Sequence, residues 1–191
     1  MKPIIFDLDD YCNEYNILPS LEFLKTKLPN LKVNLFTIPH RTTFNLLKKT
    51  ADTGWIQMIP HGFKHKTNYE CSELSKRQSK GKLNKINTQF FVNGFKAPGW
   101  QISIGMMEAL KERDHWLAVQ WSDDRMFGDP NGPFQPAVIS GLRHYALNEQ
   151  QNYEVIHGHC QEVCGNGLES LWQQLTNLSK QQKFEFINDV I

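Results

Sequence analysis

The segment IIFDLDDYCNE, residues 4–14, joins a short apolar run to three carboxylates, Asp7, Asp9 and Asp10. A short apolar run bounded by turn signals indicates a buried strand. Adjacent carboxylates at the end of such a strand repel each other unless a cation neutralises them. The pair therefore indicates a metal site or a catalytic base, with a solvated turn as the alternative, because Asp also favours loop starts.

Strand-like and helix-like segments alternate along the rest of the chain. Strands are expected over residues 3–8, 31–38, 55–60, 88–97, 116–121 and 153–159. Helices are expected over residues 20–28, 42–52, 103–114 and 168–182, with Ser20 and Ser103 as candidate N-caps. This alternation is typical of a parallel sheet covered by helices, either open or closed into a barrel. In both architectures the chemistry collects at the carboxyl ends of the strands.

Composition limits the classes of protein that fit. The 191 residues are enough for one domain and short for two, and no repeat or linker marks a boundary, so a single domain over 1–191 is expected. Lys and Arg number 21 against 20 Asp and Glu, which gives no general case for nucleic acid or an anionic membrane. No apolar run suits a membrane span, and acidic residues come too early for a signal peptide, so a cytoplasmic location is expected. The four cysteines lack zinc-ribbon spacing and are expected to be reduced thiols.

A second polar cluster follows the strand expected at 55–60. In HGFKH, His61 and His65 stand four residues apart, so a helical turn would place both imidazoles on one face. Two neutral imidazoles and one carboxylate form a common site for zinc or another divalent metal, with open positions for water and substrate. Asp10 or Asp9 can supply that carboxylate, which leaves the other as a base. The alternative for HGFKH is a polar loop on a basic surface.

Further titratable groups follow the later strands. They are Lys96 in KAPGW, Asp123 and Asp124 in WSDD, and His157 and His159 in VIHGH. Because the carboxyl ends of parallel strands lie at one edge, these groups are expected to converge on one rim.

The order of these motifs resembles that of the polysaccharide deacetylase family, which contains the NodB-homology domain and corresponds to carbohydrate esterase family 4. The matching stretches are FDLDDY, HGFKH, FKAPGW, WSDD and VIHGH, from about residue 6 to residue 160. The resemblance implies an α/β fold of the irregular (β/α)7 barrel type. It also implies a metal-dependent hydrolase, acting on C–N bonds other than peptide bonds, that removes an N- or O-linked acetyl group from a sugar or polysaccharide precursor.

The resemblance assigns roles to individual residues. Asp9 becomes the general base, His157 the general acid, and Asp10, His61 and His65 the ligands of a divalent metal, with zinc as the expected ion. These residue types suit the reaction, because the metal polarises the acyl carbonyl while the base and the acid move protons. His157 is favoured over His159 as the acid because it fits the hydrophobic-x-His pattern of the family.

Several positions differ from the family motifs, among them Leu8 and Tyr11, which flank the acidic pair where the family usually reads Thr-Phe-Asp-Asp-Gly. Lys96 stands where the family has Arg; lysine keeps the charge that orients Asp9 but loses the planar, two-pronged geometry. Gly62 stands where the family has Ser or Thr after the first His. Asp7 adds a third carboxylate, which shares a strand face with Asp9 and is expected to line the site.

Other residues are candidates for substrate contact or for orienting the catalytic groups. They are Trp100 and Trp121 as a wall for sugar stacking, Asp123 or Asp124 as the carboxylate that orients the catalytic His, and His159 beside the substrate. The alternative for the two tryptophans is a place in the core. The basic stretch SKRQSKGKLNK, residues 75–85, is expected to be a solvated segment. The alternative is that it binds the phosphate of a nucleotide-linked or lipid-linked sugar.

Two other functions fit the same residues. One is a metal-dependent amidohydrolase acting on a different acyl group or on a non-sugar amide. The other is a catalytically inactive carbohydrate-binding relative, which Lys96 favours and the complete set of acidic and histidine motifs disfavours. The expected partner in the leading hypothesis is an acetylated sugar or glycan precursor, and the sequence leaves the oligomeric state open.

Overall fold

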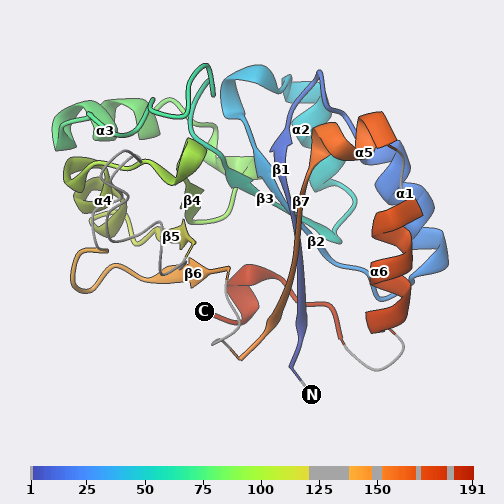
Figure 1. The fold of residues 1–191 in the computed structure, drawn as a ribbon. Coiled ribbons are helices and arrows are strands. Elements are labelled where there is room, and N and C mark those ends of the chain that lie inside the picture. Colours follow the sequence, from blue (N-terminus) through green and yellow to red (C-terminus); the bar gives the residue numbers. More distant parts are fainter. Residues whose placement is uncertain (1, 121–137, 148–151, 167–168, 180–182) are drawn as a thin grey trace.

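The computed structural model describes residues 2–120, 138–147, 152–166, 169–179 and 183–191 (Figure 1). Its strands form two sheets, ordered β3-β2-β1-β7 and β4-β5-β6, in which every neighbouring pair is parallel. The strands are β1 (Ile4–Tyr11), β2 (Val33–Thr37), β3 (Ile56–Pro60), β4 (Gly94–Lys96), β5 (Trp116–Val119), β6 (His144–Ala146) and β7 (Glu154–His159). The prediction of an α/β fold built on parallel strands is confirmed.

The two sheets are joined at the end of β3. A single bridge pairs His61, directly after β3, with Lys96 in β4. On the other side, Tyr153, directly before β7, contacts β6: its hydroxyl accepts from the N–H and donates to the carbonyl of Ala146, at 3.1 and 3.0 Å. Strand pairing among the described residues therefore gives two sheets joined by one bridge, without the fully hydrogen-bonded ring of a closed barrel.

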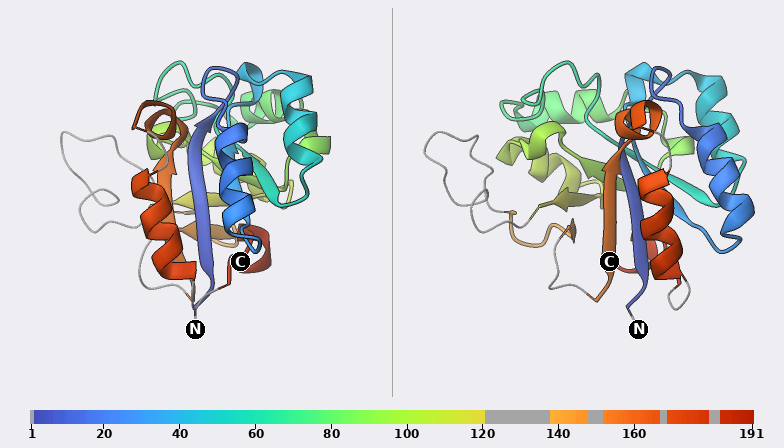
Figure 2. Two further views of the ribbon diagram at one scale, coloured as in Figure 1. Left: turned by 90° about the vertical axis from the view of Figure 1, so that its right-hand side faces the viewer. Right: turned by 45° about the vertical axis from the view of Figure 1, so that its right-hand side comes forward.

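Alternation along β1 separates an outer face from an inner face. Ile4, Phe6 and Leu8 pack in one core cluster with leucines of α1 (Leu18–Lys27) and with Leu175 of α6 (Glu169–Ser179), and Figure 2 shows both helices running along β1. Ile5 belongs to a second cluster with residues of the other sheet. Because strand side chains alternate, Asp7 and Asp9 lie on the inner face with Ile5.

The remaining helices cover the outer sides of the sheets. They are α2 (Phe44–Ala51), α3 (Lys76–Leu83), α4 (Ile104–Lys111) and α5 (Cys160–Asn166). Apolar side chains of α3 and α4 pack with residues of β4 and β5, on the opposite side of the molecule from α1 (Figure 1). Within the described ranges, every helix is too short or too polar to cross a bilayer. All four cysteines are unbridged.

Several expected boundaries are wrong. Ser20 does not cap α1, which begins at Leu18 with Pro19 in its first turn, a position for which the fixed φ of proline is suited. The strand expected over 88–97 is a 3-10 turn followed by the short β4. The prediction that Ser103 caps α4 is confirmed, because its hydroxyl accepts from the Met106 amide at 3.0 Å.

Candidate active site

An irregularity at the end of β1 turns two adjacent carboxylates to the same side. The pairing with β2 shifts register between Leu8 and Tyr11, and Asp10 has a φ of 66°. Asp enters this left-handed region more readily than most residues, and a bulge re-aims the side chains beside it. Asp9 Oδ2 and Asp10 Oδ1 consequently lie 4.0 and 3.5 Å from Nε2 of the same histidine, His61.

The HGFKH segment is a loop and not a helical turn, yet it still brings the two imidazoles together. Gly62 and His65 both have positive φ, 58° and 47°, and the turn this creates brings the His61 and His65 rings to a centroid distance of 4.7 Å. The Glu70 carboxylate accepts the Phe63 and His65 amides at 2.6 and 3.1 Å. A Cβ at position 62 would overlap Glu70 Oε1, so glycine makes room for this carboxylate.

Asp10, His61 and His65 form a group that could hold a metal ion. Asp10 Oδ1 lies 3.5 Å from His61 Nε2 and 3.3 Å from His65 Nε2. This oxygen is buried and has no hydrogen-bond partner among the residues that the structure describes, whereas Oδ2 accepts from Gln161 at 3.0 Å. A buried carboxylate oxygen without a partner is costly, and a divalent cation between the two imidazoles would satisfy it.

The environment of His61 suits a metal ligand. Its Nδ1 lies 3.2 Å from the Lys96 carbonyl, which fixes the ring and leaves Nε2 facing Asp10. Burial lowers the pKa of His61 to about 4, although Asp9 acts in the opposite direction. The imidazole is therefore neutral at physiological pH, as metal ligation requires. The donor set of two imidazoles and one carboxylate fits zinc and similar divalent ions.

Asp9 is paired with the buried side chain of Lys96. The ammonium donates to both carboxylate oxygens, at 2.7 and 2.5 Å, and also lies 3.9 Å from the ring centroid of Trp100. Burial alone would raise the pKa of Asp9, but Lys96, His61 and His157 together lower that pKa to about 2. Asp9 is therefore a carboxylate that stays ionised while facing the site.

A second carboxylate of β1 holds His157. Asp7 is fully buried; its Oδ1 pairs with His157 Nδ1, and its Oδ2 accepts from the Tyr145 hydroxyl at 2.6 Å. Burial would lower the pKa of His157, but the Asp7 carboxylate raises it above its usual range. The imidazole is thus oriented with Nε2 toward Asp9, 3.7 Å from Oδ2.

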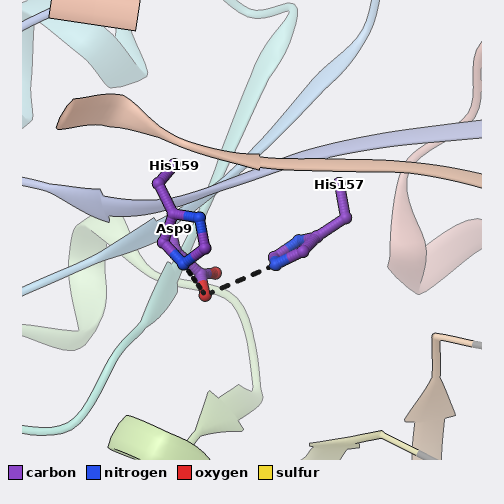
Figure 3. A group of neighbouring side chains, drawn as sticks. All are labelled: Asp9, His157 and His159. Carbon is purple, nitrogen blue, oxygen red and sulfur yellow. Dashed lines mark ion pairs between the residues drawn. The ribbon is translucent and has the colours of Figure 1, made fainter. Parts of the chain in front are cut away.

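His159 and Trp100 complete the group of site candidates that the structure describes. His159 Nε2 lies 3.9 Å from Asp9 Oδ2, and Figure 3 shows His157 and His159 converging on this carboxylate. The Trp100 ring lies 6.5 Å from the His157 ring, between centroids, so it borders the site. The other candidates, Trp121, Asp123 and Asp124, lie outside the described residues.

Glu70 and Tyr145 are site residues that the sequence did not reveal. Glu70 follows HGFKH by five positions, so an acidic residue close behind the histidines was a usable signal. Tyr145 is 138 residues from Asp7, and nothing local connects the two.

The sequence matches no protein-family model and no curated protein. Its fold, however, is similar over 99% of the chain to solved structures. A family 4 acetyl xylan esterase from Clostridium thermocellum, in complex with a cobalt ion, has a TM-score of 0.62 and 13% identity, with 90% of that chain covered. A peptidoglycan N-acetylglucosamine deacetylase has a TM-score of 0.65 and 16% identity, with 87% covered. A family 4 pseudoenzyme from Bacillus anthracis has a TM-score of 0.64 and 15% identity, with 65% covered.

These similarities define a class of fold. The chain has the fold of the family 4 carbohydrate esterases, which is the fold that the order of its motifs predicted.

Proposed function

We propose that the chain is a metal-dependent hydrolase that removes an N- or O-linked acetyl group from a sugar or polysaccharide precursor. The observation that carries this proposal is the position of Asp9. Its ionised carboxylate lies within 4.0 Å of Nε2 of His61, in the candidate metal group, and within 3.7 Å of Nε2 of His157. The proposed base, Asp9, thus lies beside both the proposed acid and the candidate metal group.

Asp10, His61 and His65 are the proposed ligands, with zinc as the proposed ion. When bound there, a divalent metal supplies Lewis acidity, which polarises the acyl carbonyl and makes water a better nucleophile. The buried carboxylate oxygen of Asp10 is the observation that favours this assignment.

Asp9 and His157 are proposed to move the protons. Asp9 takes a proton from the attacking water, because Lys96 keeps it ionised and holds both of its oxygens in place. His157 protonates the departing amine or alkoxide from Nε2, because its Nδ1 is bound to Asp7. Asp7 is therefore proposed for the orienting role that was expected of Asp123 or Asp124.

The neighbours in fold support the reaction class. An acetyl xylan esterase and an N-acetylglucosamine deacetylase both remove acetyl groups from carbohydrate, and the cobalt complex agrees with a divalent ion. Trp100, which borders His157, is proposed as a surface for sugar stacking. The single domain over 1–191 and the cytoplasmic location stay predictions from the sequence.

An inactive carbohydrate-binding relative is the second candidate, because one neighbour is a family 4 pseudoenzyme. Acetate release separates the two functions. Zinc-loaded protein would be incubated with acetylated xylan and with N-acetylglucosamine oligomers, alongside folded His61→Ala and His157→Ala variants. Acetate released by the parent and by neither variant supports the hydrolase. Saccharide binding without acetate release would show the inactive relative.

A further inference from the structure

We propose that Asp9, His157 and His159 form a second, weaker site for a divalent metal, beside the group of Asp10, His61 and His65. An ion in this second site would hold the base and the acid and so block hydrolysis. The blocking effect rests on the proposed function, whereas the binding site rests on geometry alone.

The three ligand atoms converge on one point. Nε2 of His157 and Nε2 of His159 lie 3.7 and 3.9 Å from the same oxygen, Asp9 Oδ2, and all three atoms lie within 4.8 Å of one another (Figure 3). Metal–ligand bonds of about 2 Å around a tetrahedral ion place ligand atoms about 3.3 Å apart. Small side-chain rotations therefore suffice to form the site.

The backbone places these ligands. In the parallel pairing of β1 with β7, Asp9 stands opposite His159, and Asp7 stands opposite His157. His157 and His159 are two residues apart on one strand, so their side chains lie on the same face. Two rigid strands thus present the three ligands, and no loop needs to reorganise.

Each histidine turns Nε2 toward Asp9 and has a carboxylate on the side of Nδ1. Nδ1 of His157 is bound to Asp7, and Nδ1 of His159 lies 3.7 Å from Glu162 Oε1. A carboxylate behind the imidazole is the usual arrangement for a histidine that binds metal, because it fixes the ring and makes the ligand more basic. The His159 side chain is 43% exposed, which gives an ion a route from solvent.

The proposed hydrolysis does not require His159. One acid is enough to protonate the leaving group, and His157 has the buried Asp7 carboxylate that this role needs. A second histidine aimed at the same Asp9 oxygen is therefore surplus to hydrolysis but completes a group of three ligands.

Charge explains why the second site is the weaker one. A second ion would bind the Asp9 oxygen that already accepts from the Lys96 ammonium, which lies 2.5 Å from Asp9 Oδ2 and repels a cation. It would also lie close to the ion held by Asp10, because Asp9 Oδ2 is 4.0 Å from His61 Nε2. We therefore expect sequential filling, first at Asp10 and then at Asp9.

Equilibrium dialysis against increasing Zn²⁺, followed by elemental analysis, tests the site. The parent should bind one ion tightly and a second at higher concentration. His159→Gln should retain the tight ion and weaken the second by roughly 10-fold or more, whereas His61→Ala should weaken the tight one. His40→Gln, which removes an exposed histidine outside both groups, is the matched control and should leave both ions unchanged. A second ion bound equally by the parent and His159→Gln, or no second ion, would overturn the site.

Lys96→Met gives an independent measurement. Removing the competing ammonium should strengthen binding of the second ion roughly 10-fold, since a charge a few ångströms away is lost. An unchanged or weaker second ion in the folded variant contradicts the proposal. Zinc inhibition of acetate release should follow the filling of the second site and shift to higher concentration in His159→Gln. A protein that binds two ions but releases no acetate even when only the tight ion is bound would leave the site standing and remove the proposed function. Hydrolysis with the tight ion and no second ion at any zinc concentration would do the reverse.

Discussion

The Lys96 ammonium donates hydrogen bonds to both oxygens of Asp9, at 2.7 and 2.5 Å, across 87 residues of sequence. Lysine thus contacts both oxygens of the carboxylate with one nitrogen, where arginine would use two. The Phe36 and Trp100 rings lie 4.7 and 3.9 Å from the same nitrogen, between Nζ and the ring centroids, so aromatic faces help to hold the buried charge. Lys96, which stands where the family motif has Arg, therefore still holds Asp9 in place and keeps it ionised.

Lys96→Met should abolish most of the activity, whereas Lys96→Arg should retain part of it. Without the cation, Asp9 is a buried carboxylate that lacks its partner, which also costs about 3–5 kcal/mol of stability. Acetate release by zinc-loaded protein measures the first effect and urea unfolding the second. Parental activity in folded Lys96→Met would show that Lys96 is not the functional partner of Asp9.

The paired carboxylates should separate by role. Asp10→Asn should weaken zinc binding, because Oδ1 of Asp10 is the proposed ligand. Asp9→Asn should retain the tightly bound zinc and lower turnover by roughly 10²–10⁴, because a proton acceptor is lost. Metal content and single-turnover acetate release distinguish the two. Equal loss of the tight ion in both variants would mean that the carboxylates bind it jointly.

Asp7 should set the pH dependence. A general acid must be protonated, so turnover falls as pH rises through the pKa of His157, which Asp7 raises. Asp7→Asn removes that charge, lowers the pKa and should move the alkaline limb of kcat to lower pH. Tyr145→Phe keeps the Asp7 charge and is the control, with a smaller shift expected. If the alkaline limb does not move in Asp7→Asn, the limb reports the titration of a group other than His157.

Sequence patterns predicted the parts of this site that depend on strand alternation. Asp7 and Asp9 share the inner face of β1 as expected, because side chains on a strand alternate. The turn of Asp10 toward His61 depends on a local register shift and a positive φ, which no periodicity encodes.

Three elements, α3, α5 and β6, were missed, and α3 and β6 show two different reasons. The helix α3 has only Ser79 and Leu83 buried, so it lacks the apolar stripe of an amphipathic helix and depends on a capping box between Ser75 and Gln78. The strand β6 is three residues long, too short for a pattern to show, yet it carries Tyr145. Partners distant in sequence, such as Tyr145 and Asp7, become neighbours only through the sheets.

The loop that carries His65 depends on one carboxylate. Glu70 accepts the amides of Phe63, Lys64 and His65, at 2.6, 3.2 and 3.1 Å. His61 is held separately, since its own amide donates to the Thr37 carbonyl at 2.7 Å. Loss of the Glu70 charge should therefore loosen His65 more than His61.

We expect Glu70→Gln to weaken zinc binding roughly 10–100-fold, the usual effect of removing a group that supports a metal ligand. Equilibrium dialysis of the folded variant measures the affinity, and urea unfolding measures stability separately. Glu73→Gln, which changes an exposed glutamate three residues away, is the matched control. Gly62→Ala should weaken zinc binding as well, because its Cβ would meet Glu70 Oε1. A Glu70→Gln variant that is less stable but binds zinc like the parent would show that Glu70 supports the fold and does not position His65.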